Sequence, residues 1–103
     1  MVKALRASVL AGGLLLAAGV QAGDVDDGRQ LAQQCVKCHG TTGKATSKGY
    51  PNLNGQNAAY VEKVLKAYRD KSRKGALAFL MYPETANLSD DDIEDLAAFY
   101  AEQ

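Results

Sequence analysis

The sequence contains few of the sulfur and imidazole side chains that bind transition metals. Its 103 residues include two cysteines, one histidine, two methionines and no tryptophan. A structural zinc site takes about four Cys or His ligands, and after Cys35, Cys38 and His39 no other Cys or His is left. Zinc bound to these three residues would need a carboxylate or water to complete its coordination. The usual kind of zinc site is therefore disfavoured.

Several other patterns are also missing. Lysine and arginine form no dense basic run, so nucleic acid binding is not expected. The chain has no internal repeat or low-complexity tract, which indicates a single small domain. A thioredoxin-like dithiol needs a strand, a turn and a helix, but no strand pattern lies near Cys35 and Cys38. A plain disulfide between these cysteines would close a tiny loop and leave His39 unexplained.

The cysteines and the histidine stand together as Cys35-Val36-Lys37-Cys38-His39. This pattern is typical of c-type haem attachment. In that chemistry each thiol adds to a vinyl group of the porphyrin, and the adjacent imidazole becomes an axial ligand of the iron. One haem c per chain is therefore the preferred interpretation. Zinc, a dithiol and a disulfide are the alternatives.

The N-terminal residues 1–22 resemble a secretory signal peptide. Lys3 and Arg6 precede an apolar stretch, which ends in the small-x-small cleavage pattern of residues 20–22. The stretch is short and interrupted by glycines, whereas a membrane-spanning helix needs about 20 apolar residues. We therefore expect cleavage after residue 22 and a mature domain comprising residues 23–103.

Export agrees with haem attachment, because exported thiols are usually captured as thioethers or disulfides. Without Lys3 and Arg6, ten basic residues stand against twelve acidic ones, a net charge of −2. We expect a soluble periplasmic protein with no stable membrane insertion. Three lysines near the haem motif either face an acidic redox partner or are simply solvated. They are Lys37, Lys44 and Lys48.

Hydrophobic periodicity predicts an all-α protein. Three helices are expected, over residues 26 to about 35, 57 to about 70 and 90 to about 102. Asn57 is expected to cap the second helix, and Ser89 with Asp92 resembles a capping box before the third. Residues 40–55 are rich in Gly, Thr, Ser, Asn and Pro and are predicted to form a long loop.

A second axial ligand is expected at Met81. The other methionine, Met1, lies in the export signal, so Met81 is the one thioether left in the mature chain. Soft sulfur suits ferrous iron, and His/Met ligation raises the reduction potential. The alternative is that Met81 packs in the core with its neighbours Phe79 and Leu80.

Further segments accompany the haem motif. They are Pro51-Asn52-Leu53-Asn54-Gly55-Gln56, Met81, Leu88-Ser89-Asp90-Asp91-Asp92-Ile93 and Leu96-Ala97-Ala98-Phe99-Tyr100. Together with the motif they resemble bacterial class I cytochromes c, over the whole of residues 23–103. The resemblance is to small monohaem proteins or to one half of the periplasmic dihaem cytochromes. It implies three to five short helices wrapped around one covalently bound haem.

The resemblance also implies roles for individual residues. Cys35 and Cys38 match the thioether positions, His39 the proximal ligand and Met81 the distal ligand. Pro51 matches a proline whose carbonyl accepts a hydrogen bond from the ligating imidazole and so orients the ring.

Other positions follow from the same resemblance. Gly28 matches the small residue where the first and last helices cross, with Phe99 or Tyr100 packed opposite. One departure follows Met81, where Pro83 is expected to stiffen the segment and bias Tyr82 toward an extended conformation. Four polar residues are candidates to meet the haem propionates: Gln56, Tyr60, Arg69 and Arg73.

The implied function is one-electron transfer between a protein donor and a protein acceptor, through transient contacts and without a bound substrate. On this interpretation the chain is a monomeric periplasmic electron carrier and not an enzyme. One alternative is the haem c subunit of a larger oxidoreductase, such as a flavocytochrome or a sulfur-oxidising complex. Another is a ligand-binding haem protein or peroxidase-like enzyme, in which Met81 leaves the iron accessible.

Overall fold

The structure is a computed structural model that describes residues 23–103. The predicted signal peptide, residues 1–22, lies outside the described residues. Within the described part every regular element is a helix, as predicted. In chain order they are α2 Val25–Leu31, η1 Ala32–Gln34, α3 Val36–His39, α4 Ala58–Arg69, η2 Ala78–Leu80, α5 Tyr82–Thr85 and α6 Asp90–Ala101, where η marks a 3-10 helix. Over residues 23–103 no helix is long and apolar enough to cross a membrane.

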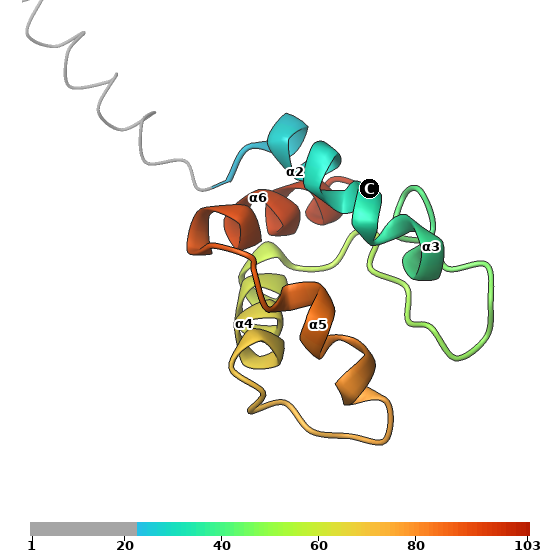
Figure 1. Cartoon of the computed structure of the whole chain (residues 1–103). Helices are drawn as coiled ribbons and strands as arrows, with labels where there is room; N and C mark the ends of the chain where they lie inside the picture. The colour runs from blue at the N-terminus through green and yellow to red at the C-terminus, as the bar shows by residue number, and fades with distance from the viewer. Residues whose placement is uncertain (1–22) are drawn as a thin grey trace, which may run out of the picture.

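Helices α2 and α6 pack against each other (Figure 1), and Gly28 lies where they cross. Gly28 is buried, and a Cβ placed there would overlap the backbone carbonyl of Asp95 and lie 2.8 Å from the Cβ of Phe99. The crossing predicted at Gly28 is therefore confirmed, with Phe99 as the residue opposite. Asp24 caps α2 by accepting a hydrogen bond from the Asp27 amide at 2.9 Å.

Helix α6 begins with the predicted capping box. The Ser89 hydroxyl accepts from the Asp92 amide, the Asp92 carboxylate accepts from the Ser89 amide, and both distances are 3.0 Å. The apolar face of α6 then forms the centre of the core. Its buried residues are Ile93, Leu96, Ala97, Phe99 and Tyr100.

Helix α4 packs against both α6 and α5. Asn57 caps α4 as predicted, because its side chain accepts from the Tyr60 amide at 3.0 Å. At the other end, the Arg69 guanidinium donates to the Leu88 carbonyl at 2.9 Å and to an Asp90 carboxylate oxygen at 2.7 Å. Arg69 thus ties the end of α4 to the start of α6, and this contact occupies a residue that was a propionate candidate.

The first helix covers the predicted range, with α2 ending at Leu31 and the 3-10 turn η1 continuing to Gln34. The local prediction for Tyr82 was wrong. Tyr82 is not extended, because it is the first residue of α5, with Pro83 in the first turn. Proline is compatible with that position, since backbone N–H groups of the first helical turn have no partner within the helix.

Candidate haem-binding site

The Cys-x-x-Cys-His motif forms one short helix. Cys35 is the N-cap of α3, and the amides of Cys38 and His39 donate to its carbonyl at 3.3 and 2.9 Å. Both cysteines are half-buried free thiols. Residues three positions apart lie on the same face of a helix, so the two thiols are presented together. Gly40, at φ 82°, then ends the helix in a conformation that side chains rarely adopt.

The imidazole of His39 is buried and oriented by the backbone. The side chain is 7% exposed, and its Nδ1 lies 2.9 Å from the Pro51 carbonyl oxygen, which is the contact that the resemblance predicts. A carbonyl only accepts hydrogen bonds, so Nδ1 carries the proton. The lone pair of the neutral ring is then on Nε2, the nitrogen available to a metal.

The backbone of Met81 is held by the helical turns before and after it. The Met81 amide donates to the Ala78 carbonyl at 3.0 Å. Its carbonyl accepts from both the amide and the hydroxyl of Thr85, each at 3.1 Å. Thr85 is 1% exposed and its hydroxyl is satisfied. The sequence analysis missed Thr85, although its position four residues after Met81 is a helical spacing.

Large apolar side chains lie exposed beside Met81. Leu77, Phe79 and Leu80 are 56%, 60% and 42% exposed and lie within four consecutive residues of the chain, with the buried Ala78 among them. Such a concentration of exposed apolar surface usually marks a binding surface. A porphyrin ring is an apolar group of the right kind to cover it. The described residues also supply two thiols, an imidazole and a methionine thioether, so the types of donor present fit a c-type haem.

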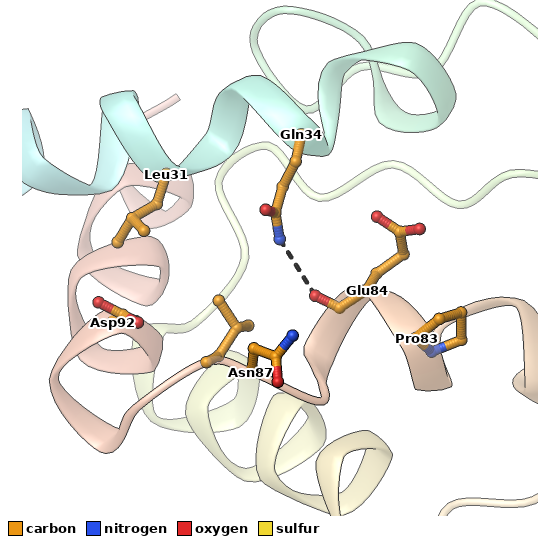
Figure 2. Close-up of a pocket in the computed structure, with 7 residues that line it drawn as sticks. Leu31, Gln34, Pro83, Glu84, Asn87 and Asp92 are labelled. Carbon is orange, nitrogen blue, oxygen red and sulfur yellow. Dashed lines mark hydrogen bonds between the residues drawn. The ribbon is translucent and has the colours of Figure 1, made fainter.

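A side-chain contact joins the cysteine-bearing segment to the methionine-bearing segment. The Gln34 amide, one residue before Cys35, donates to the Glu84 carbonyl in α5 at 3.1 Å (Figure 2). This bond crosses a pocket between α2, α5 and α6. The pocket is lined by Leu31, Gln34, Pro83, Glu84, Asn87, Leu88 and Asp92. Gln34 was not predicted, because nothing in its local sequence indicates a partner so far along the chain.

Tyr100 on α6 contributes a buried hydroxyl close to the first cysteine. The residue is 2% exposed, and its hydroxyl has no hydrogen-bond partner of ordinary geometry. Burial raises the pKa of Tyr100, and the neighbouring Cys35 thiol raises it further. Burial likewise raises the pKa of Cys35, while the Tyr100 hydroxyl opposes that rise. The ring also packs on Gly43, where an added Cβ would lie 2.8 Å from it.

Comparison with known proteins identifies the family. The family model described as cytochrome c matches residues 25–102. The chain belongs to the cytochrome c family. Cytochrome c-554(548) of Halomonas halodenitrificans is 51% identical over 82 residues, which are 80% of this chain and 99% of that protein. The thiosulfate dehydrogenase electron acceptor of Thiomonas intermedia is 35% identical over 69 residues, 67% of this chain and 32% of that protein.

Solved structures agree. The cytochrome c4 structure from Acidithiobacillus ferrooxidans matches with a TM-score of 0.72 at 22% identity, covering 82% of this chain and 52% of that one. The predicted class I cytochrome c fold is therefore confirmed. As a cytochrome c, the chain carries covalently bound c-type haem and acts in electron transport with redox partners. This result sets aside the zinc, dithiol and disulfide alternatives.

Replacing Tyr100 by phenylalanine should leave this cytochrome c as stable at pH 7, or slightly more stable. We expect the free energy of unfolding to change by less than about 1 kcal/mol, because the lost hydroxyl has no clear partner. The measurement is guanidinium unfolding of the holoprotein. A loss above about 2 kcal/mol would mean that the hydroxyl makes a real hydrogen bond, for example to the Cys35 sulfur.

The same variant should change the alkaline limit of stability. The pKa of Tyr100 is raised above its ordinary value of 10.0 in the folded protein. An unfolded tyrosine therefore loses its proton at a lower pH, and the stabilisation present below pH 10 is lost as the pH rises further. Between about pH 10 and 12, the free energy of unfolding should fall less steeply with pH in Tyr100→Phe than in wild type. Tyr50→Phe, at a 40% exposed tyrosine, is the control and should follow wild type.

Proposed function

We propose that this cytochrome c is a periplasmic one-electron carrier whose haem iron is ligated by His39 and Met81. The observation that carries the proposal is the orientation of His39, whose Nδ1 is engaged by Pro51 and whose Nε2 is left to bind iron. Met81 supports it, because no other thioether occurs in residues 23–103 and its backbone is fixed beside exposed apolar side chains. With His39 and Met81 both bound, a haem iron would have no open position for oxygen or peroxide.

Each residue of the site has a distinct part in this proposal. Cys35 and Cys38 would form the two thioethers and keep the haem attached in both oxidation states. Pro51 holds the His39 ring and strengthens its donor nitrogen through the hydrogen bond at Nδ1. Bound haem supplies a one-electron couple between ferric and ferrous iron. Covering the exposed side chains of Leu77, Phe79 and Leu80 with the haem would exclude water there, so little would have to reorganise when the charge changes.

Export and partner recognition complete the proposal. Residues 1–22 act as a signal peptide that delivers residues 23–103 to the periplasm as a monomer. Three exposed lysines lie on α3 and the loop after it: Lys37, Lys44 and Lys48. We propose that they meet an acidic surface on a redox partner in a short-lived complex, in which complementary charge speeds the encounter.

Absorption spectroscopy of the purified holoprotein tests the ligation. The oxidised protein should show a methionine-to-iron charge-transfer band, and carbon monoxide should leave the spectrum of the reduced protein unchanged. Absence of the band together with binding of carbon monoxide would contradict the proposal. That outcome would favour the ligand-binding or peroxidase-like alternative.

A second candidate keeps the chemistry but changes the setting. One relative is named thiosulfate dehydrogenase electron acceptor, and this chain covers 32% of its length. In this second candidate function, the chain is a haem subunit or dedicated partner of a larger oxidoreductase. Co-purification of a stoichiometric partner at physiological salt would favour this candidate, whereas a monomer of the chain alone would favour the diffusing carrier.

A further inference from the structure

Arg73 is held in a fixed position at both its backbone and its side chain. Its amide donates to the Ala67 carbonyl at 3.2 Å, and its carbonyl accepts from the Tyr82 hydroxyl at 2.7 Å. The guanidinium lies over the ring of Tyr68, 5.4 Å from the ring centroid. The Tyr68 hydroxyl raises the pKa of Arg73, and Tyr60 acts in the same direction. The cation is therefore oriented by aromatic side chains.

This arginine differs from the other two in the described part of the chain. Arg29 pairs with Asp26, and Arg69 pairs with Asp90 at 2.7 Å. Arg73 has no carboxylate within 4.0 Å among residues 23–103. An ordered guanidinium presents its N–H groups in a planar fork that matches the two oxygens of a carboxylate. Arg73 thus offers hydrogen-bond donors that fit a carboxylate, and no carboxylate of residues 23–103 pairs with it.

We propose that Arg73, together with Tyr68 and Tyr60, binds a carboxylate, and that this carboxylate is a propionate of the covalently bound haem. The inference rests on the proposed ligation by Met81. Arg73 lies at the start of the segment that joins α4 to α5, the loop at the bottom of Figure 1. The Tyr82 hydroxyl ties this arginine to the residue directly after Met81. The proposed carboxylate site and the proposed iron ligand Met81 therefore lie in one segment, which this hydrogen bond holds together.

Tyrosine and arginine complement one another at such a site. The Tyr60 side chain is 46% exposed, so a bound group can reach it from solvent. A neutral hydroxyl donates a hydrogen bond without adding charge, while the guanidinium balances the negative charge. The other source of a carboxylate is an acidic side chain of a redox partner, which has the same chemistry but arrives from outside.

Arg73→Gln and Lys74→Gln in the holoprotein form a matched pair. Both remove one positive charge, and they are neighbours on the same exposed stretch. Loss of a cation bound to a propionate favours ferric iron. At a fixed ambient potential, the ratio of reduced to oxidised protein should fall about three- to tenfold in Arg73→Gln. It should change by less than about 1.5-fold in Lys74→Gln, where solvent and salt screen the charge.

A kinetic measurement distinguishes the two sources of the carboxylate. The probe is the reduction of each oxidised variant by the iron(II)–EDTA chelate, whose carboxylates mimic an external partner. In one outcome the ratio of reduced to oxidised protein is unchanged, and the reduction rate falls selectively in Arg73→Gln and only at low salt. That outcome would show that Arg73 binds an external carboxylate and not the propionate. If Arg73→Gln matches Lys74→Gln in both measurements, Arg73 binds no carboxylate.

Two further observations keep the test independent of folding and of the axial ligands. Arg73→Lys keeps the charge but loses the planar fork, so its ratio should lie between those of wild type and Arg73→Gln. It also serves if Arg73→Gln does not fold. The methionine-to-iron band should persist in all of these variants. Absence of the band from wild type would refute the Met81 ligation itself. Presence of the band, with no effect of Arg73→Gln on the ratio or the rate, would refute only the carboxylate site at Arg73.

Discussion

Met81→Ala is expected to open the haem iron. The variant should lose the methionine-to-iron charge-transfer band and bind carbon monoxide when reduced, because no second thioether occurs in residues 23–103 to take its place. A thioether stabilises ferrous iron, so the ratio of reduced to oxidised protein at a fixed potential should fall at least about tenfold. Optical spectra with and without carbon monoxide, and a redox titration, measure the three effects.

Leu80→Ala is the matched control for this prediction. Leu80 is adjacent to Met81 and 42% exposed, so the variant removes apolar surface from the same segment without touching the thioether. It should keep the band and exclude carbon monoxide. A band that survives in Met81→Ala would show that another group ligates the iron. Loss of the band in both variants would instead show that the segment has moved.

The candidate site was predictable where its chemistry is local or scarce. Cys35, Cys38 and His39 are contiguous, and Met81 stands out because no other methionine follows the predicted signal peptide. The supporting contacts were not predictable from the residues alone. Gln34 meets a backbone carbonyl 50 residues away, and its amide carries no mark of that partner. Such contacts depend on the path of the chain.

The fold shows the same division. The capping box at Ser89 depends on residues three positions apart, so a local pattern was sufficient to predict where α6 begins. The helix at Pro83 was missed because proline in sequence is ambiguous. It biases the preceding residue away from helix, yet it is also favoured in a first helical turn. The carbonyl of Met81, which accepts two bonds from Thr85, favours the helical outcome.

Gly28→Ala should strongly destabilise the protein. Within a helix, alanine is favoured over glycine by about 1 kcal/mol, so a variant free of contacts would be more stable. Here the added methyl group would overlap the Asp95 carbonyl and press on the Cβ of Phe99 at 2.8 Å. Neither neighbour is a flexible side-chain end, so α2 and α6 must move apart. We expect a net loss of about 2 to 4 kcal/mol in the free energy of unfolding of the holoprotein.

Two control variants separate crowding at the crossing from the general effects of an alanine substitution in this chain. Gln30→Ala lies on the exposed side of α2 and should change the unfolding free energy by less than about 0.5 kcal/mol. Gly49→Ala has open space around it but a φ of 97°, so it should cost about 1 kcal/mol through the backbone alone. A cost for Gly28→Ala no larger than that of Gly49→Ala would show that the helices can separate easily. The crossing would then contribute little to holding the haem-bearing segment against α6.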